Sequence, residues 1–234
     1  RGGAPVLFTR GRRTSGVDLE TVDFAPWTDG AIQDCFIRVI RLHNRGDTEA
    51  PASNLVVAGS QHLEADGSRL LELTEERVLA TGFADGVGET ETDRLFRAVP
   101  ALAAGETRQH ILLHCTALGE TPMAFPTVDL AQLLSDTAER YGAWEATLID
   151  VEAPDPVVVD FIDGMKMTLK VQTTAQGATS PMSEYTGTWP RDNMGPVLAM
   201  LSLGGFEDVE GMLDYVYKAI LLRGGPGKSC DSDL

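Results

Sequence analysis

Residues 35–42 read Cys35-Phe36-Ile37-Arg38-Val39-Ile40-Arg41-Leu42. β-Branched and aromatic residues dominate this run, and two arginines interrupt its apolar character. The five residues that follow, 43–47, include Asn, Gly and Asp, which favour a turn. The segment is therefore predicted to be a β-strand that ends in a turn.

Three further runs have the same strand character, at residues 55–58, 77–80 and 110–115. Stretches with Gly, Asp or both lie between them, at 64–68 and 103–106, and are typical of turns. Many short strands joined by such turns indicate an antiparallel β-sandwich. We predict that the sandwich occupies residues 1–126, but the order of its strands is not readable from the pattern.

Helical spacing replaces this pattern after the predicted sandwich. It begins near Thr127, a candidate N-cap, and its apolar positions are Leu130, Leu133, Leu134, Ala138 and Tyr141. We predict a linker helix within residues 127–153. It either ends near Tyr141, before Gly142, or continues through Trp144.

Residues 154–223 are predicted to be helical as well. Pro156 suits the first turn of a helix. After it, an apolar stripe with i, i+4, i+8, i+12 spacing is formed by Val157, Phe161, Met165 and Leu169. One apolar face on a helix usually packs against another element, so we expect this stripe to be covered.

A helical hairpin is predicted after the loop 174–190, which is rich in Gly, Ser, Thr and Pro. Its first helix spans 192–203 and is stopped by Gly204-Gly205. Its second helix has apolar positions at Phe206, Val209, Leu213, Val216 and Ile220. Two helices joined so tightly should pack antiparallel. The tail, 224–234, is predicted to be flexible.

The charge of the chain restricts its partners. A net charge of −16 argues against nucleic-acid and anionic-membrane surfaces, where basic residues would meet phosphates. There is no apolar run of the length needed for a membrane span. The start, Arg1-Gly2-Gly3-Ala4-Pro5, lacks an initiator Met and an apolar signal core, so we expect a processed or trimmed start. We expect a soluble protein, with the cytoplasm favoured but the location left open.

The cysteines and histidines suggest no metal or redox site. Cys35, Cys115 and Cys230 are widely spaced and odd in number, so we predict free, mostly buried thiols rather than a disulfide framework. His110 and His114 are four residues apart, a metal spacing on a helix but not on the strand predicted there. We interpret the histidines as structural or surface residues.

The most informative segment reads Met182-Ser183-Glu184-Tyr185-Thr186-Gly187-Thr188-Trp189-Pro190-Arg191-Asp192-Asn193-Met194. Its Trp-x-Arg-Asp pattern resembles a stretch of glucoamylases and related six-hairpin, (α/α)6-barrel glycosidases. The helix, polar loop and Leu-Gly-Gly hairpin around it resemble the opening of that family's barrel over about residues 157–223. More loosely, the β region and linker helix look like the N-terminal sandwich and linker of many bacterial members. The resemblance implies a sandwich, a linker helix and the opening helices of an incomplete barrel.

The resemblance also implies a sugar-binding role for three residues. In that family the Arg-Asp pair lines the sugar pocket, so Arg191 and Asp192 would contact sugar hydroxyls and Trp189 would form part of the pocket wall. A carboxylate accepts, a guanidinium donates and an indole packs on C–H faces, which suits these roles. The alternative interpretation is that Asp192 is a simple N-cap paired with Arg191 at the surface. Glu184 and Tyr185 are interpreted as solvated loop residues.

No catalytic residue is assigned in this chain. In the resembled family the general acid and base are glutamates on later hairpins, and this chain reaches only the opening of the barrel. The acidic residues of the last predicted helix are interpreted as its solvated face, without a catalytic role: Glu207, Asp208, Glu210 and Asp214.

The resemblance implies the N-terminal part of an enzyme that hydrolyses α-glucosidic bonds by inversion, without a metal or other cofactor. We expect the chain alone to be inactive. The alternatives are a non-catalytic carbohydrate- or protein-binding module, or a truncated product without a role of its own. Carbohydrate is the expected partner, and an exposed helical hairpin would favour self-association or a protein partner.

Overall fold

A computed structural model describes residues 5–12, 16–27, 35–58, 63–73, 77–118, 125, 127–174, 176–179 and 189–223 of the chain. The chain divides into two compact units. The β unit comprises Val6–Arg140, and the helical unit comprises Tyr141–Leu234 together with Arg1–Pro5. The sequence-based boundaries at 126 and 153 stay predictions. The predicted flexible tail, 224–234, lies outside the described residues.

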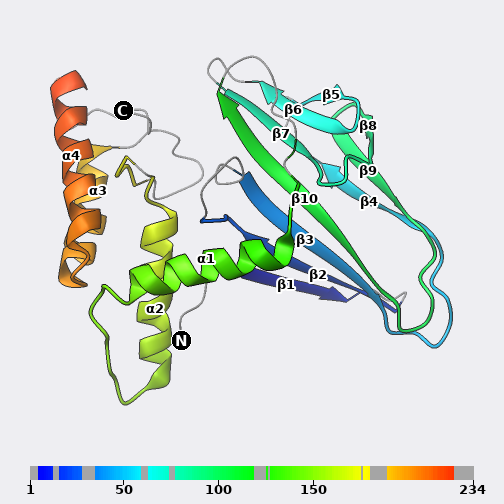
Figure 1. Ribbon diagram of the computed structural model, residues 1–234, viewed down its shortest axis with the longest axis horizontal. Helices are drawn as coiled ribbons and strands as arrows, with labels where there is room; N and C mark the ends of the chain where they lie inside the picture. The colour runs from blue at the N-terminus through cyan, green and yellow to red at the C-terminus, as the bar shows by residue number, and fades with distance from the viewer. Residues whose placement is uncertain are drawn as a thin grey trace. The chain divides into compact units, whose positions relative to one another are not determined.

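The β unit contains two antiparallel sheets (Figure 1). The large sheet has the order β1-β2-β3-β10-β7-β6-β5, and the small sheet has the order β4-β9-β8. The strands are β1 (Leu7–Arg12), β2 (Val17–Phe24), β3 (Cys35–Asn44), β4 (Ser53–Ala58), β5 (Leu63–Asp66), β6 (Arg69–Leu73), β7 (Arg77–Phe83), β8 (Glu89–Glu91), β9 (Arg94–Val99) and β10 (Thr107–Leu118). The prediction of a β-sandwich followed by helices is confirmed.

The central strand β3 shows why the sequence produces this architecture. Ile37 and Val39, on one face of the strand, pack in a core with Leu133 of the first helix. Ile40, on the opposite face, packs with Leu95 of the small sheet. Alternation along a strand thus supplies two apolar surfaces, because successive side chains point to opposite faces. One surface takes the first part of that helix and the other takes the small sheet.

The prediction of free thiols is wrong for two of the three cysteines. Cys35 and Cys115 form a disulfide between β3 and β10, with their Cα atoms 4.1 Å apart. The two residues are direct partners in the register of these strands, and each is 3% exposed. A separation of 80 residues hides this pairing in the sequence, because only the strand order brings the two thiols together. Cys230 lies outside the described residues.

The structure has four helices in its described part: α1 (Leu130–Glu145), α2 (Pro156–Val171), α3 (Pro190–Ser202) and α4 (Phe206–Arg223). Helix α1 continues through Trp144, which confirms the second of the two predicted alternatives. Its cap is Asp129 rather than Thr127, since the Asp129 carboxylate accepts hydrogen bonds from the N–H groups of Ala131 and Gln132 at 3.1 Å each. Helix α2 begins at Pro156, as predicted, and Asp155 caps it.

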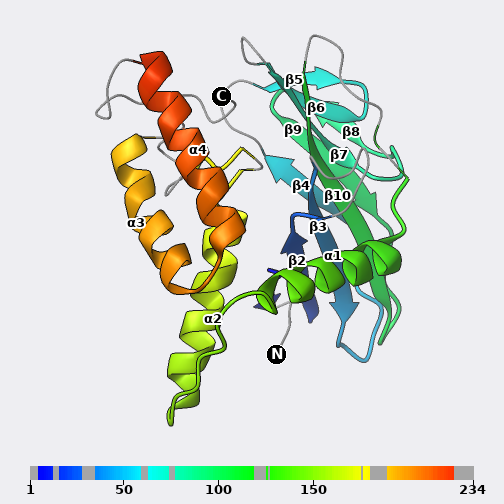
Figure 2. The same ribbon diagram turned by 60° about the vertical axis from the view of Figure 1, so that its left-hand side comes forward.

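Helices α3 and α4 form the predicted antiparallel hairpin (Figure 2). Gly204 has a φ of +81°, and the Gly205 N–H donates to the Met200 carbonyl at 3.0 Å. This pattern closes the end of a helix with a left-handed glycine. The buried side of α4 includes Val209, Met212 and Val216.

The apolar stripe of α2 does not lie where the sequence places it. Val157 is 69% exposed, Phe161 66% and Met165 43%, whereas α2 buries Val159 and Lys166. The Lys166 ammonium, only 2% exposed, pairs with Asp163 at 3.0 Å. The expectation that this stripe packs on another element is therefore wrong within this structure, because the partners of α2 cover its other side.

No helix in the described part of the chain is long and apolar enough to cross a membrane.

Candidate functional site

The first turn of α3 holds the residues that carry the family resemblance. Trp189 is the residue before the helix, with an extended backbone, and its carbonyl accepts hydrogen bonds from the N–H groups of Asp192 at 2.9 Å and Asn193 at 3.2 Å. Pro190 occupies the first helical position, where its missing N–H costs nothing. The helix thus begins two residues earlier than predicted. Asp192 lies within the first turn, so the alternative interpretation of Asp192 as the N-cap is wrong, whereas the surface pair with Arg191 that it included is present.

Arg191 and Asp192 lie together at the surface of the helical unit. The Arg191 Nε donates to the Asp192 Oδ1 at 2.9 Å, and the two side chains are 78% and 36% exposed. The hydrogen bond to Asp192 raises the pKa of Arg191 from its ordinary value. Together they present a donor and an acceptor to solvent, the combination that a sugar diol can bind.

The third predicted residue, Trp189, is half-buried at the cap position directly before this pair. Glu184 and Tyr185, interpreted above as solvated loop residues, lie outside the described residues. The structure therefore places Trp189 at the cap of α3 and Arg191 and Asp192 in its first turn.

Asn193 anchors this turn, and sequence reasoning missed it. Its side chain is fully buried; Oδ1 accepts from the Thr179 N–H at 3.3 Å, and Nδ2 donates to the Gly177 carbonyl at 3.5 Å. Thr179 in turn forms a bridge with Thr173, at the end of α2. An amide with both a donor and an acceptor is suited to join two backbones, and its place next to Asp192 is the only signal that the sequence offers.

Gly177 lets the segment that Asn193 holds approach α4. Its φ is +93°, and a Cβ added there would lie 2.3 Å from the carbonyl oxygen of Gly211. A side chain at 177 would therefore collide with the α4 backbone. The segment that Asn193 binds thus lies in close backbone contact with α4.

A second polar cluster lies within the helical unit, around Asp208 of α4. The Lys170 ammonium contacts Asp208 Oδ1 at 2.6 Å, and the Trp144 indole N–H donates to Oδ2 at 2.7 Å. The Lys170 ammonium also lies 5.3 Å from the Trp144 ring centroid. The Asp208 and Lys170 side chains are only 13% and 22% exposed. The interpretation of Asp208 as solvated is therefore wrong, because α2 and the last turn of α1 cover it.

Replacing Asp208 with Ala should lower the free energy of unfolding of the helical unit by about 2 kcal/mol, since it leaves a largely buried ammonium and an indole N–H without their acceptor. The matched control is Asp214→Ala, which removes an exposed pair with Lys218 at 2.6 Å and should cost about 0.5 kcal/mol or less. Urea unfolding followed by far-UV circular dichroism measures both. Equal losses in the two variants would contradict the structural role of Asp208.

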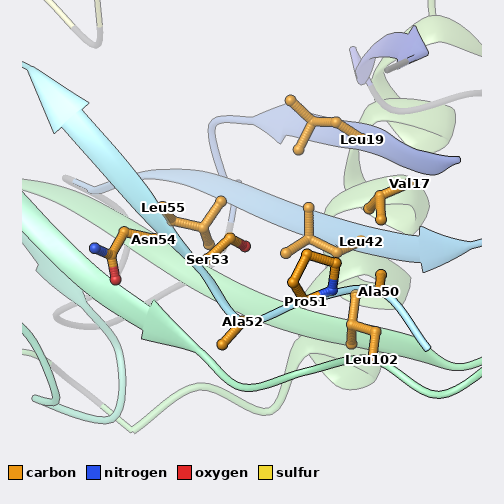
Figure 3. A pocket seen from close by; sticks show the side chains of 10 residues that line it. All are labelled: Val17, Leu19, Leu42, Ala50, Pro51, Ala52, Ser53, Asn54, Leu55 and Leu102. Atoms are coloured by element: carbon orange, nitrogen blue, oxygen red, sulfur yellow. The ribbon is translucent and has the colours of Figure 1, made fainter. Parts of the chain in front are cut away.

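The β unit contains a pocket of a different character (Figure 3). It has a volume of about 210 Å³ and lies between strands β2 and β3 and the segment that leads into β4. Its lining residues are Val17, Leu19, Leu42, Ala50, Pro51, Ala52, Ser53, Asn54, Leu55 and Leu102. None is aromatic or ionisable, and the polar side chains of the lining are those of Ser53 and Asn54. This pocket thus offers no aromatic ring on which a sugar face could stack.

Among the described residues, no group of three or more His, Cys, Asp or Glu side chains is arranged to hold a metal ion.

Comparison with known proteins shows a similarity in fold. No family model matches the chain, and no curated protein matches it. A solved structure named "Putative kojibiose phosphorylase from human microbiome" is similar to this chain, with a TM-score of 0.54 and 10% sequence identity. The alignment covers 84% of this chain and 32% of that chain, so the present chain spans about a third of the length of its structural neighbour. At this identity the likeness concerns the fold.

Proposed function

We propose that this chain is the N-terminal part of a carbohydrate-active enzyme of the glycosidase type, and that the first turn of α3 grips a sugar ring. The exposed Arg191–Asp192 pair, with its hydrogen bond of 2.9 Å, is the observation that carries the proposal. The fold similarity to a structure named as a kojibiose phosphorylase supports a carbohydrate-active origin. Glucoamylase-like hydrolysis of α-glucosidic bonds by inversion is the finer form of this proposal.

The chemistry of the turn supports sugar binding in three ways. Asp192 can accept hydrogen bonds from two hydroxyls, and Arg191 donates in fixed directions. Trp189, the residue before the helix, would supply an indole for the apolar face of a pyranose. Asn193 limits the freedom of the turn through its two backbone contacts, so less conformational entropy is lost on binding.

Exposed apolar side chains on the helices support a larger helical domain. They include Phe161 of α2, Leu198 of α3, and Tyr217 and Leu221 of α4, each at least 59% exposed. Where exposed apolar side chains form a contiguous patch, that patch usually marks an interface. In the proposed enzyme these faces pack against further helical hairpins of an (α/α)6 barrel. The general acid and base come from those hairpins. The 234 residues therefore bind sugar but do not hydrolyse it.

Calorimetric titration with maltoheptaose and with kojibiose tests the proposal. We expect weak, enthalpy-driven binding that falls about tenfold or more in Asp192→Asn and in Trp189→Ala, because each change removes a direct contact to the ligand. Glu207→Gln is the matched control, since it removes a carboxylate from the first turn of α4 and leaves the α3 turn intact.

The outcomes separate the proposal from its rival. Binding that persists in both α3 variants would place the sugar site in the β unit, as for a non-catalytic binding module. A wild-type chain that binds neither sugar would contradict the proposed grip. Release of glucose from maltose by the purified chain would contradict the assignment of the acid and base to other hairpins.

A further inference from the structure

A charged side chain from the small sheet reaches into the interior of the β-sandwich. Leu95 and Val99 of β9 are buried at 0% and 2% exposure, and Arg97 lies between them in the same alternating row. The Arg97 guanidinium binds both Asp85 carboxylate oxygens, at 2.5 and 2.6 Å, and donates to the Val87 carbonyl at 2.7 Å. Asp85 and Val87 lie in the connection from β7 of the large sheet to β8 of the small sheet, so this contact joins β9 to the segment that links the two sheets.

His110 of β10 lies beside this contact. His110 is only 7% exposed. Its ring packs edge-on against the Phe83 ring, with the two ring centroids 6.3 Å apart. The Arg97 guanidinium lies over the same Phe83 ring, 5.2 Å from its centroid. The His110 Nε2 is buried and has no hydrogen-bond partner among the residues that the structure describes. A neutral imidazole tolerates this site, whereas an imidazolium would bury an N–H without an acceptor.

We propose that His110 is an acid-sensitive latch of the β-sandwich: protonation of its ring loosens the small sheet, β4-β9-β8, from the large sheet. The charged groups that face the ring are Arg97 from β9, Asp85 from the turn after β7, and Arg108 from its own strand. From β3 the paired residue is apolar Ile40. The guanidinium groups of Arg97 and Arg108 would therefore repel a protonated His110 ring. The one carboxylate among these groups, that of Asp85, already binds Arg97.

The sign of the pH dependence follows from this arrangement. Burial, and then the charges of Arg97 and Arg108, lower the pKa of His110 from its ordinary value of 6.5, although Asp85 acts in the opposite direction. Between the folded pKa and the ordinary value, the unfolded chain therefore binds a proton that the folded chain does not. The contribution of His110 to stability is complete above the ordinary pKa and is lost as the pH falls through the folded pKa.

Urea unfolding of the full chain between pH 7.5 and pH 5 tests the latch in the wild type, His110→Gln and His110→Phe. The carboxylates titrate in all three proteins, so the difference between their curves reports His110. We expect the unfolding constant of the wild type, relative to either variant, to rise by up to about tenfold per pH unit below the ordinary His pKa. Amide exchange of β9 in the wild type, corrected for the intrinsic rate, should accelerate over the same range.

Parallel pH profiles in the wild type and the variants would overturn the proposal. An NMR titration of the histidine rings in the wild-type protein decides the matter even if neither variant folds. A His110 ring that titrates at or above the ordinary value would contradict the latch. A ring that titrates below that value, together with faster exchange at β9, supports it.

Discussion

Reduction of the Cys35–Cys115 disulfide is expected to lower the free energy of unfolding of the β unit by about 4 kcal/mol. The bridge joins residues 80 positions apart, and a cross-link over so long a loop removes many conformations from the unfolded chain. The bridge also connects β3 and β10, two central strands of the large sheet. Its loss should therefore affect the whole β unit rather than an edge.

Urea unfolding of the Cys230→Ser variant, with and without a phosphine reductant, measures this effect with only the paired cysteines present. Thiol titration of the unfolded protein should find no free thiol before reduction and two after it. Because both cysteines are 3% exposed, we expect reduction to be slow without denaturant. Two free thiols before reduction, or equal unfolding midpoints in the two conditions, would contradict the bridge.

Gly177→Ala should lower the free energy of unfolding of the helical unit by about 3–4 kcal/mol. Two costs combine: an L-residue at a φ of +93° is strained, and the new Cβ would lie 2.3 Å from the Gly211 carbonyl oxygen. Relief of that clash would move the segment that Asn193 binds. The Arg191–Asp192 pair should then lose its orientation, and the variant should bind sugar less tightly than the wild type.

Gly204→Ala separates these two costs. Gly204 has a similar φ of +81°, but its nearest neighbour is the Ile149 side chain at 3.3 Å rather than a backbone atom. We expect this control to cost about 1 kcal/mol, mainly from the backbone conformation. Thermal unfolding of both variants, monitored at the helical far-UV signal, provides the comparison. Similar melting temperatures in the two variants would show that the approach to Gly211 is not tight.

Local signals in the sequence were sufficient to predict which of these segments form strands and which form helices. The β-branched and aromatic run around Val39 predicted a strand, Pro156 predicted the start of a helix, and Gly204-Gly205 predicted the end of one. The structure has each of them. The Trp-x-Arg-Asp motif likewise singled out three candidate residues, which the structure places at the start of α3. These features depend on residues within a few positions of one another, so a single strand or turn of helix is enough to express them.

The partners of those elements were decided by tertiary structure. The disulfide depends on the register of β3 against β10. The Asp208 side chain is largely buried because α2 and α1 cover this part of α4. The role of Asn193 depends on the turn at Gly177. The sequence correctly identified an apolar stripe on α2, but the prediction that another element covers this stripe was wrong. Periodicity identifies an apolar face but not what packs against it. The chain's local pattern thus specifies strands, helices and a candidate sugar-binding turn. Contacts between residues far apart in sequence settle which thiols pair, which charges are buried and how that turn is held, since these depend on distances that only packing defines.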